Sequence, residues 1–250
     1  MLKITQEKHI LFISLNRPDV RNSFNSEMIQ EIKNQFSEIQ NRTEVRAVVL
    51  SGEGKVFCAG ADLNWMKSMA NYSLEQNKKD STLLFEMFEA IWTCPVPVVG
   101  LVHGAAFGGA LGLMACCDFV VAADNTQLAF SEVKIGLIPA VISHFIIRKC
   151  QLGALNPLML SGQVFSPKQV LGTGLVHEVC SDGELAGKLS SYLQSITESA
   201  PEAVRTIKKL VRESATMNWS ESKQACVNAI AERRVSLEGQ EGMKSFLEKR

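Results

Sequence analysis

The chain has 250 residues, of which 46% are hydrophobic, and its 26 basic side chains are balanced by 26 acidic ones. This length suffices for one large domain with a substantial core. The balanced charge, without a Lys/Arg block, argues against a nucleic-acid partner. The seven cysteines include no Cys-x-x-Cys pair, so we expect reduced core thiols and neither a disulfide framework nor a metal site.

We expect neither an export signal nor a membrane span in this sequence. Its first residues, MLKITQEKH, lack the apolar stretch of a secretory signal and the Arg/Ser bias of a transit peptide. Residues 96–117 contain no Asp, Glu, Lys or Arg, which is long enough for a membrane span, but five glycines and His103 interrupt them. We therefore expect a strand, a tight turn and a buried helix here, in a cytoplasmic protein with no membrane partner.

Strand-like and helical segments alternate along the first half of the chain. The apolar residues 9–15 predict a strand, and the turn-forming residues 16–22 predict a loop after it. Residues 26–41 place apolar side chains three and four positions apart, which predicts a helix with one buried face. The short apolar run 47–52 predicts a buried strand that leads into a glycine-bearing loop, residues 52–63.

The second half begins with two more strand-like runs, residues 97–104 and 119–124, and becomes mostly helical after Pro139. Alternating strands and helices predict an α/β core with parallel or mixed pairing. We place this core at residues 1–195. A helical C-terminal region, residues 196–250, is expected to pack on the core or on a neighbouring subunit.

Several ordered motifs resemble the signature segments of one enzyme family. They are FCAGADL (57–63), HGAAFGGALGLMACCD (103–118) and SEVKIGLIP (131–139), with NRPDVRN (16–22) before them and EGMKSFLEKR (241–250) at the end. Together they resemble the crotonase family, the enoyl-CoA hydratase/isomerase superfamily. The resemblance implies a spiral of ββα units with a helical C-terminal trimerisation region, a homotrimer or homohexamer, and an acyl-CoA thioester as substrate. It implies no cofactor, because coenzyme A is part of that substrate.

The glycine-bearing loops suit the chemistry of a thioester. A thioester that reacts at its α or β carbon becomes enolate-like, and fixed backbone N–H groups stabilise the developing oxyanion. By resemblance, these catalytic donors are the N–H groups of Ala61 and Gly109, the latter at the start of a helix whose dipole favours an anion. The alternative is that Gly60, Gly108 and Gly109 only permit tight turns and close packing.

The same resemblance assigns one carboxylate to catalysis. Glu132 matches a family glutamate, whereas Gly112 stands where two-carboxylate hydratases of the family carry the other. We expect partial burial to raise the pKa of Glu132 toward the range of a general base. Without the family match, the sequence around Glu132 favours a surface residue on an edge strand. A glycine at 112 is expected to leave room for a branched β carbon.

The segment PAVISHF, residues 139–145, departs from many relatives, which carry a glycine run followed by Thr-Gln-Arg. The N–H of Ala140 is a candidate for holding a water molecule, and Ile142 is expected to add apolar volume beside the acyl group. His144 is a candidate second acid/base, although a single histidine in an apolar helical segment is more often structural. Asp118 is a further candidate base if Glu132 is not the catalytic one.

A second set of residues is assigned to coenzyme A by resemblance. The thioester and its adenine and pantetheine are expected to lie against Asp19, Val20, Arg21, Ala59, Ala61, Asp62, Leu63, Gly108 and Gly109. The phosphates have candidate partners in Lys55, Lys67, Lys244 and Lys249, each of which could equally be a solvated charge. Phe246 and Lys249 are candidates for reaching a neighbouring subunit's ligand.

The combination of GGALGLMACCD (108–118) with SEVKIGLIPAVIS (131–143) most resembles single-glutamate hydratases of branched, carboxyl-bearing enoyl-CoAs, such as the methylglutaconyl-CoA and carboxygeranoyl-CoA hydratases. The leading hypothesis is therefore a hydratase that adds water to a branched, carboxyl-bearing 2-enoyl-CoA, such as 3-methylglutaconyl-CoA, through one glutamate and an oxyanion hole. A Δ3,Δ2-enoyl-CoA isomerase is the first alternative, because one carboxylate can carry a proton between two carbons. The second alternative is an acyl-CoA-binding protein without catalysis. The retained Glu132 argues against it.

Overall fold

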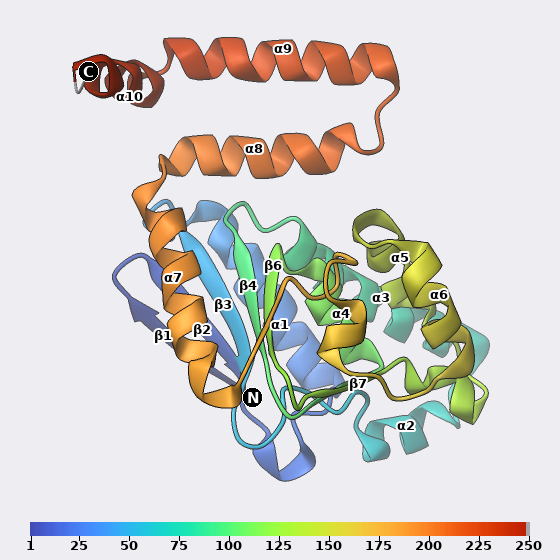
Figure 1. The fold of residues 1–250 in the computed structure, drawn as a ribbon. Helices are drawn as coiled ribbons and strands as arrows, with labels where there is room; N and C mark the ends of the chain where they lie inside the picture. The colour runs from blue at the N-terminus through green and yellow to red at the C-terminus, as the bar shows by residue number, and fades with distance from the viewer. Residues whose placement is uncertain (249–250) are drawn as a thin grey trace.

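A six-stranded sheet forms the centre of the computed structural model, which describes residues 1–248 (Figure 1). Its strands, in spatial order, are β1 (Leu2–Glu7), β2 (Ile10–Leu15), β3 (Ala47–Gly52), β4 (Val98–Val102), β6 (Phe119–Ala123) and β8 (Glu178–Cys180). Only β1 and β2 pair antiparallel, and all other neighbours are parallel. The α/β core with mixed pairing is therefore confirmed.

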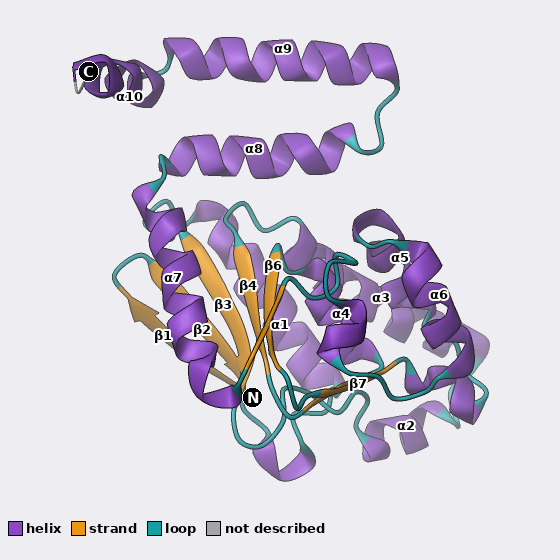
Figure 2. Cartoon of the chain, viewed as in Figure 1, coloured by secondary structure: helices purple, strands orange, loops and turns teal. Residues whose placement is uncertain are grey.

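Helices cover both faces of this sheet (Figure 2). On one face, Leu189 and Leu193 of α7 pack against Val49 and Val99. The other face carries the larger core and is covered by α1, α3 and α4. Because side chains of a strand alternate between faces, strands buried on both faces read as continuous apolar runs, which is why β3 shows four fully buried residues in a row.

The helices of the core lie between and after the strands along the chain. They are α1 (Ser26–Glu38), α2 (Leu63–Met69), α3 (Leu74–Trp92), α4 (Gly109–Cys116), α5 (Ala140–Lys149), α6 (Leu152–Ser161) and α7 (Leu185–Glu198). Short 3-10 helices lie at η1 (Pro18–Val20), η2 (Ile39–Asn41), η3 (Ser131–Ile135), η4 (Pro167–Val170) and η5 (Asp182–Glu184). In the part of the chain that the structure describes, no helix is both long enough and apolar enough to cross a bilayer.

A second, two-stranded sheet positions the candidate site. The strands β5 (Ala105–Phe107) and β7 (Gln127–Ala129) pair parallel, with Phe107 opposite Ala129. The uncharged stretch 96–117 thus folds into β4, β5 and the buried helix α4, as the glycines indicated. Because the strands are parallel, the residues that follow β5 and β7 emerge at the same edge.

Three helices leave the core at the C-terminus: α8 (Pro201–Ser214), α9 (Trp219–Val235) and α10 (Leu237–Glu248). None of their described residues is fully buried. The predicted boundary at residue 196 falls near the end of α7, and the projecting helices begin at Pro201. Six cysteines are buried thiols, whereas Cys226 in α9 is exposed.

Candidate active site

Glu132 lies against the glycine turn that precedes α4. The N–H of Gly108, just after β5, donates to the carbonyl of Ala129 at the end of β7 at 2.9 Å, and η3, which carries Glu132, follows at once. A Cβ built on Gly108 would lie 3.2 Å from Oε1 of Glu132. Gly108 also has a positive φ of 55°, so only glycine permits both this turn and the close approach of the carboxylate.

The Glu132 side chain is partly buried. Its Oε2 is buried and has no hydrogen-bond partner among the described residues. Burial raises the pKa of Glu132, which its own backbone N–H only partly counteracts. A carboxyl with a raised pKa and an unsatisfied oxygen is suited to take up and return a proton. The expected partial burial of Glu132 is therefore present, and the alternative of an exposed edge-strand residue is wrong.

The loop that carries Ala61 runs beside the glycine turn. Cys58 pairs with the β5 segment, since its N–H donates to Ala105 and its carbonyl accepts from Phe107, both at 3.1 Å. Gly60 follows with φ 93°, and a Cβ there would lie 2.9 Å from the carbonyl oxygen of Phe107. The structure thus brings the Ala61 loop and the start of α4 together.

The two predicted oxyanion donors are both unengaged. Neither the N–H of Ala61 nor that of Gly109 donates a hydrogen bond to any described residue. The first N–H groups of a helix have no acceptor within the helix, and every residue of α4 after Gly109 is buried. Free donors at the start of a buried helix suit a developing anion, because the helix dipole adds to their attraction.

The two segments assigned to coenzyme A are joined to each other. The N–H of Ala59 donates to the carbonyl of Arg21 at 3.0 Å, and that of Asp62 donates to Phe24 at 2.8 Å. The guanidinium of Arg17 joins Asp62 at 2.9 Å. These contacts fix the loop with Asp19, Val20 and Arg21 beside Ala59 to Leu63.

The Asp62 carboxylate is already committed to the fold. It caps α2 by accepting from the N–H of Asn64 at 2.8 Å and pairs with Arg17. Burial would raise the pKa of Asp62, but the backbone donors and Arg17 outweigh it and hold the pKa below its ordinary value. Leu63 points outward with 74% exposure. In this loop, a ligand would therefore meet backbone groups and the exposed Leu63 rather than a free carboxylate.

The candidate phosphate partners are scattered. Lys55 lies in the loop after β3, and Lys67 lies in the last turn of α2; both are exposed. Lys244 lies on α10 at 3.8 Å from Glu248, far along the chain from both loops. Phe246 is exposed on the same helix, and Lys249 lies outside the described residues.

The expectation that Gly112 leaves room for a branched acyl group is wrong. A Cβ at Gly112 would lie 2.8 Å from two carbons of the Phe88 ring and closer still to Cγ2 of Ile142. Both side chains are buried. The space beside Gly112 is therefore filled by the protein's own core.

Two other expectations concern residues of α5 near this site. The N–H of Ala140 donates to the carbonyl of Ile138 at 2.8 Å, so it is not free to hold a water molecule. The ring of His144 packs edge-on against Phe85, with centroids 4.9 Å apart, and burial lowers its pKa, aided by Arg148. This is the structural role that the apolar segment favoured.

The carboxylate of Asp118 is ion-paired at the C-terminal end of α4. Its carboxylate accepts from Lys208 and Arg212 of α8, each at 2.6 Å, and from the N–H of Val98 at 2.7 Å. An ion-paired carboxylate at the C-terminal end of this helix is remote from the free donors at its beginning. Asp118 is thus a structural residue rather than a candidate base.

Comparison with known proteins agrees with this arrangement. The family model described as enoyl-CoA hydratase/isomerase matches residues 5–250. The chain belongs to the enoyl-CoA hydratase/isomerase family. The crystal structure of an enoyl-CoA hydratase from Shewanella pealeana superposes with a TM-score of 0.94 at 33% identity and covers 100% of this chain and 94% of that one.

Curated relatives of this family member carry two kinds of name. The short-chain-enoyl-CoA hydratase of Clostridium acetobutylicum is 28% identical over 99% of this chain and 94% of its own. The Δ(3,5)-Δ(2,4)-dienoyl-CoA isomerase of Pongo abelii is 31% identical over 98% of this chain and 77% of its own. Family membership therefore makes the chain an enzyme of acyl-CoA thioesters, and it includes relatives named for hydration and for isomerisation.

Proposed function

We propose that this enzyme adds water to a 2-enoyl-CoA thioester with Glu132 as its only acid/base. The observation that supports this proposal most is the contact of the Glu132 carboxyl with Gly108, next to the unengaged N–H of Gly109. In this proposal, the thioester oxygen accepts hydrogen bonds from the N–H groups of Ala61 and Gly109. The enolate that forms on attack is stabilised there.

One carboxylate is sufficient for the proton balance of this reaction. Glu132 takes one proton from water as the water oxygen bonds to the β carbon, and the electron pair of the double bond moves into the thioester as an enolate. The enolate then takes that proton from Glu132 at its α carbon. Both transfers involve the same carboxyl, so we expect syn addition.

The substrate remains an enoyl-CoA of branched, carboxyl-bearing type, such as 3-methylglutaconyl-CoA, in our proposal. Its support is the motif resemblance, since the steric reason at Gly112 no longer applies. A panel of linear, branched and dicarboxylic 2-enoyl thioesters tests this choice. A higher kcat/KM for linear substrates would contradict it.

A specific observation favours the isomerase as a second candidate. Among the described residues, the Ala140 N–H is engaged and the region beside Gly112 is apolar, so no second group is placed there to bind a water molecule. An isomerase needs none, because Glu132 would remove a proton from C2 of a 3-enoyl thioester and return it at C4.

Mass spectrometry in deuterated water separates the alternatives. A hydratase converts a 2-enoyl thioester into a product heavier by one molecule of deuterated water. An isomerase converts a 3-enoyl thioester into the conjugated 2-enoyl thioester without that gain, and ultraviolet absorbance of the conjugated product detects this conversion. Recovery of every thioester unchanged, without deuterium incorporation, would support the binding protein without catalysis and contradict both enzymes.

We also propose that the enzyme assembles as a homotrimer or homohexamer. The helices α8 to α10 expose many apolar side chains, including Ile207, Val211, Trp219, Val227, Ile230, Val235, Leu237 and Leu247. Large exposed apolar surfaces usually mark an interface. Light scattering at micromolar protein concentration tests the proposal, and a monomeric mass would contradict it.

A further inference from the structure

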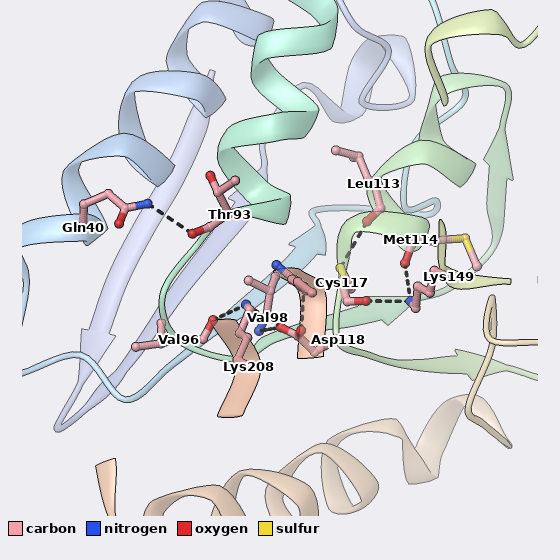
Figure 3. A network of polar contacts seen from close by, with 11 residues as sticks. Gln40, Thr93, Val96, Val98, Leu113, Met114, Cys117, Asp118, Lys149 and Lys208 are labelled. Atoms are coloured by element: carbon pink, nitrogen blue, oxygen red, sulfur yellow. Dashed lines mark hydrogen bonds and ion pairs between the residues drawn. The ribbon is translucent and has the colours of Figure 1, made fainter. Parts of the chain in front are cut away.

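Lys149 closes the C-terminal end of α4, the helix whose other end faces the proposed site. It is the last residue of α5, and its Nζ donates to the carbonyls of Met114 at 3.1 Å and Cys117 at 2.6 Å (Figure 3). The last carbonyls of a helix have no partner within it, and a cation there also interacts favourably with the helix dipole. Lys149 supplies both interactions.

Lys149 has no acidic partner of its own. None of the ion pairs among residues 1–248 includes it. Burial lowers the pKa of Lys149, and this effect is partly offset by Cys117, Cys150 and Asp118, which raise the pKa. The ammonium charge of Lys149 is therefore stabilised by two carbonyl dipoles, and no carboxylate in direct contact neutralises this charge.

The nearest charged groups leave this end of α4 positive. Asp118, which follows Cys117, carries the carboxylate, and Lys208 and Arg212 of α8 pair with it. His177 also faces Lys149, but burial, with Lys149, lowers its pKa to about 4, so it is uncharged at neutral pH. The thiols of Cys116, Cys117 and Cys150 have raised pKa values because they are buried, and they add no negative charge.

The two ends of α4 are close enough for the charge of Lys149 to attract a negative charge at the start of the helix. The helix has eight residues, so it spans about 12 Å. Between unit charges at that separation, with the effective dielectric constant of about 20 found for proteins, the interaction corresponds to a factor of roughly ten or less. The site end carries an unpartnered oxygen of Glu132 and the free N–H of Gly109, and it contains no charged residue in its own first turn.

We propose that Lys149 is a positioning residue for the thioester site: it fixes the C-terminal end of α4 and increases the attraction for negative charge at the beginning of that helix. This inference rests on the proposed function of Glu132 and Gly109. Lys149 also links α5 to α4 at a second point, since Ile142 of α5 packs at Gly112. It touches neither the proposed substrate nor the reacting atoms.

Three substitutions separate charge from packing. Lys149→Met keeps the length of the side chain and removes its charge and donors, Lys149→Gln keeps donors without the charge, and Lys149→Arg keeps the charge. Lys33→Met is the matched control, because it removes a lysine that pairs with Glu86 between α1 and α3, away from α4. Thermal unfolding shows which variants fold.

Two measurements then test the role. In Lys149→Met we expect kcat to fall by roughly five- to tenfold with little change in KM. The infrared carboxyl band of Glu132 is identified as the band that disappears in Glu132→Gln. Titration of this band in Lys149→Met should show a higher pKa of Glu132 than in the wild type, because a stabilising cation has been removed. Lys149→Arg and Lys33→Met should resemble the wild type in both measurements.

The infrared measurement keeps the two proposals distinguishable. If the wild type converts no enoyl thioester, the proposed function fails, while the Glu132 titration still decides whether Lys149 acts on that end of α4. An unchanged Glu132 titration in folded Lys149→Met would overturn the inference and leave Lys149 as a helix cap. If Lys149→Met does not fold, the comparison of Lys149→Gln with Lys149→Arg decides, and equal titrations in that pair overturn it.

Discussion

Replacing Gly112 with alanine tests whether the space beside α4 is filled by the protein. The new Cβ would lie 2.8 Å from two carbons of the Phe88 ring and would also overlap Ile142. Phe88 is 0% exposed and Ile142 is 3% exposed, so neither side chain can swing into solvent. One of them has to leave its preferred rotamer, or α3 and α5 have to move away from α4.

The expected cost follows from two opposing effects. Forcing extra volume into a packed core costs about 1–3 kcal/mol, while replacing glycine by alanine inside a helix contributes about 0.5–1 kcal/mol of stability. We therefore expect Gly112→Ala to lower the free energy of unfolding by about 1 kcal/mol, which is close to the difference between the midpoints of these two ranges. For a chain of this size, each kcal/mol corresponds to roughly 2–4 °C in Tm.

The measurement is thermal unfolding at one fixed protein concentration, with Gly187→Ala as the matched control. Gly187 lies in α7, is exposed, and has nothing within 4 Å of its Cβ position, so its substitution should leave Tm unchanged or raise it. Adding Ile142→Ala to Gly112→Ala should cost less than the sum of the two single changes, because it removes a clashing atom. A Tm of Gly112→Ala at or above that of the wild type would refute the filled-space account.

Three further predictions concern charged groups. Glu132→Gln should lower kcat by about a hundredfold or more while a substrate analogue still binds; near-normal turnover would exclude the single-carboxylate mechanism. Because burial raises the pKa of Glu132, its contribution to stability is fully present below its ordinary pKa and is lost as pH rises through the folded-state pKa. Urea unfolding should therefore show Glu132→Gln gaining stability over the wild type as pH rises, and a constant difference would contradict this. Asp118→Asn should cost about 3 kcal/mol, since it leaves Lys208 and Arg212 without their carboxylate, and should speed proteolysis between α7 and α8; unchanged cleavage would show that other contacts hold α8.

The strands of the main sheet were predictable where both faces are buried. The runs that became β2, β3, β4 and β6 are mostly apolar because helices cover both sides of the sheet. By contrast, β1 was not predicted: it is an edge strand in which only Leu2 is even partly buried, so its sequence carries no apolar pattern. The strands β5 and β7 have three residues each, which is too short for periodicity to appear.

The candidate site was predictable only in its local parts. The glycine turns and the position of Glu132 follow from motifs read along the chain, and the structure brings them together at Gly108. The filling of the space at Gly112 could not be read in this way, because Phe88 and Ile142 come from helices far before and after it. Likewise, no local signal marks Lys149, whose acceptors Met114 and Cys117 lie more than thirty residues earlier.

The composition of α4 explains why its neighbours carry the charges. Its sequence, GALGLMAC, contains no ionisable group apart from one buried thiol, and glycines at 109 and 112 let Phe24, Phe88 and Ile142 pack directly on its backbone. A helix enclosed in this way offers only its dipole and its terminal N–H and carbonyl groups. In the proposed mechanism, the proton carrier comes from the segment after β7, at Glu132, and the cations at the last turn of α4 come from α5 and α8. A substitution at either end should consequently alter the same property, the stability of negative charge at the start of α4.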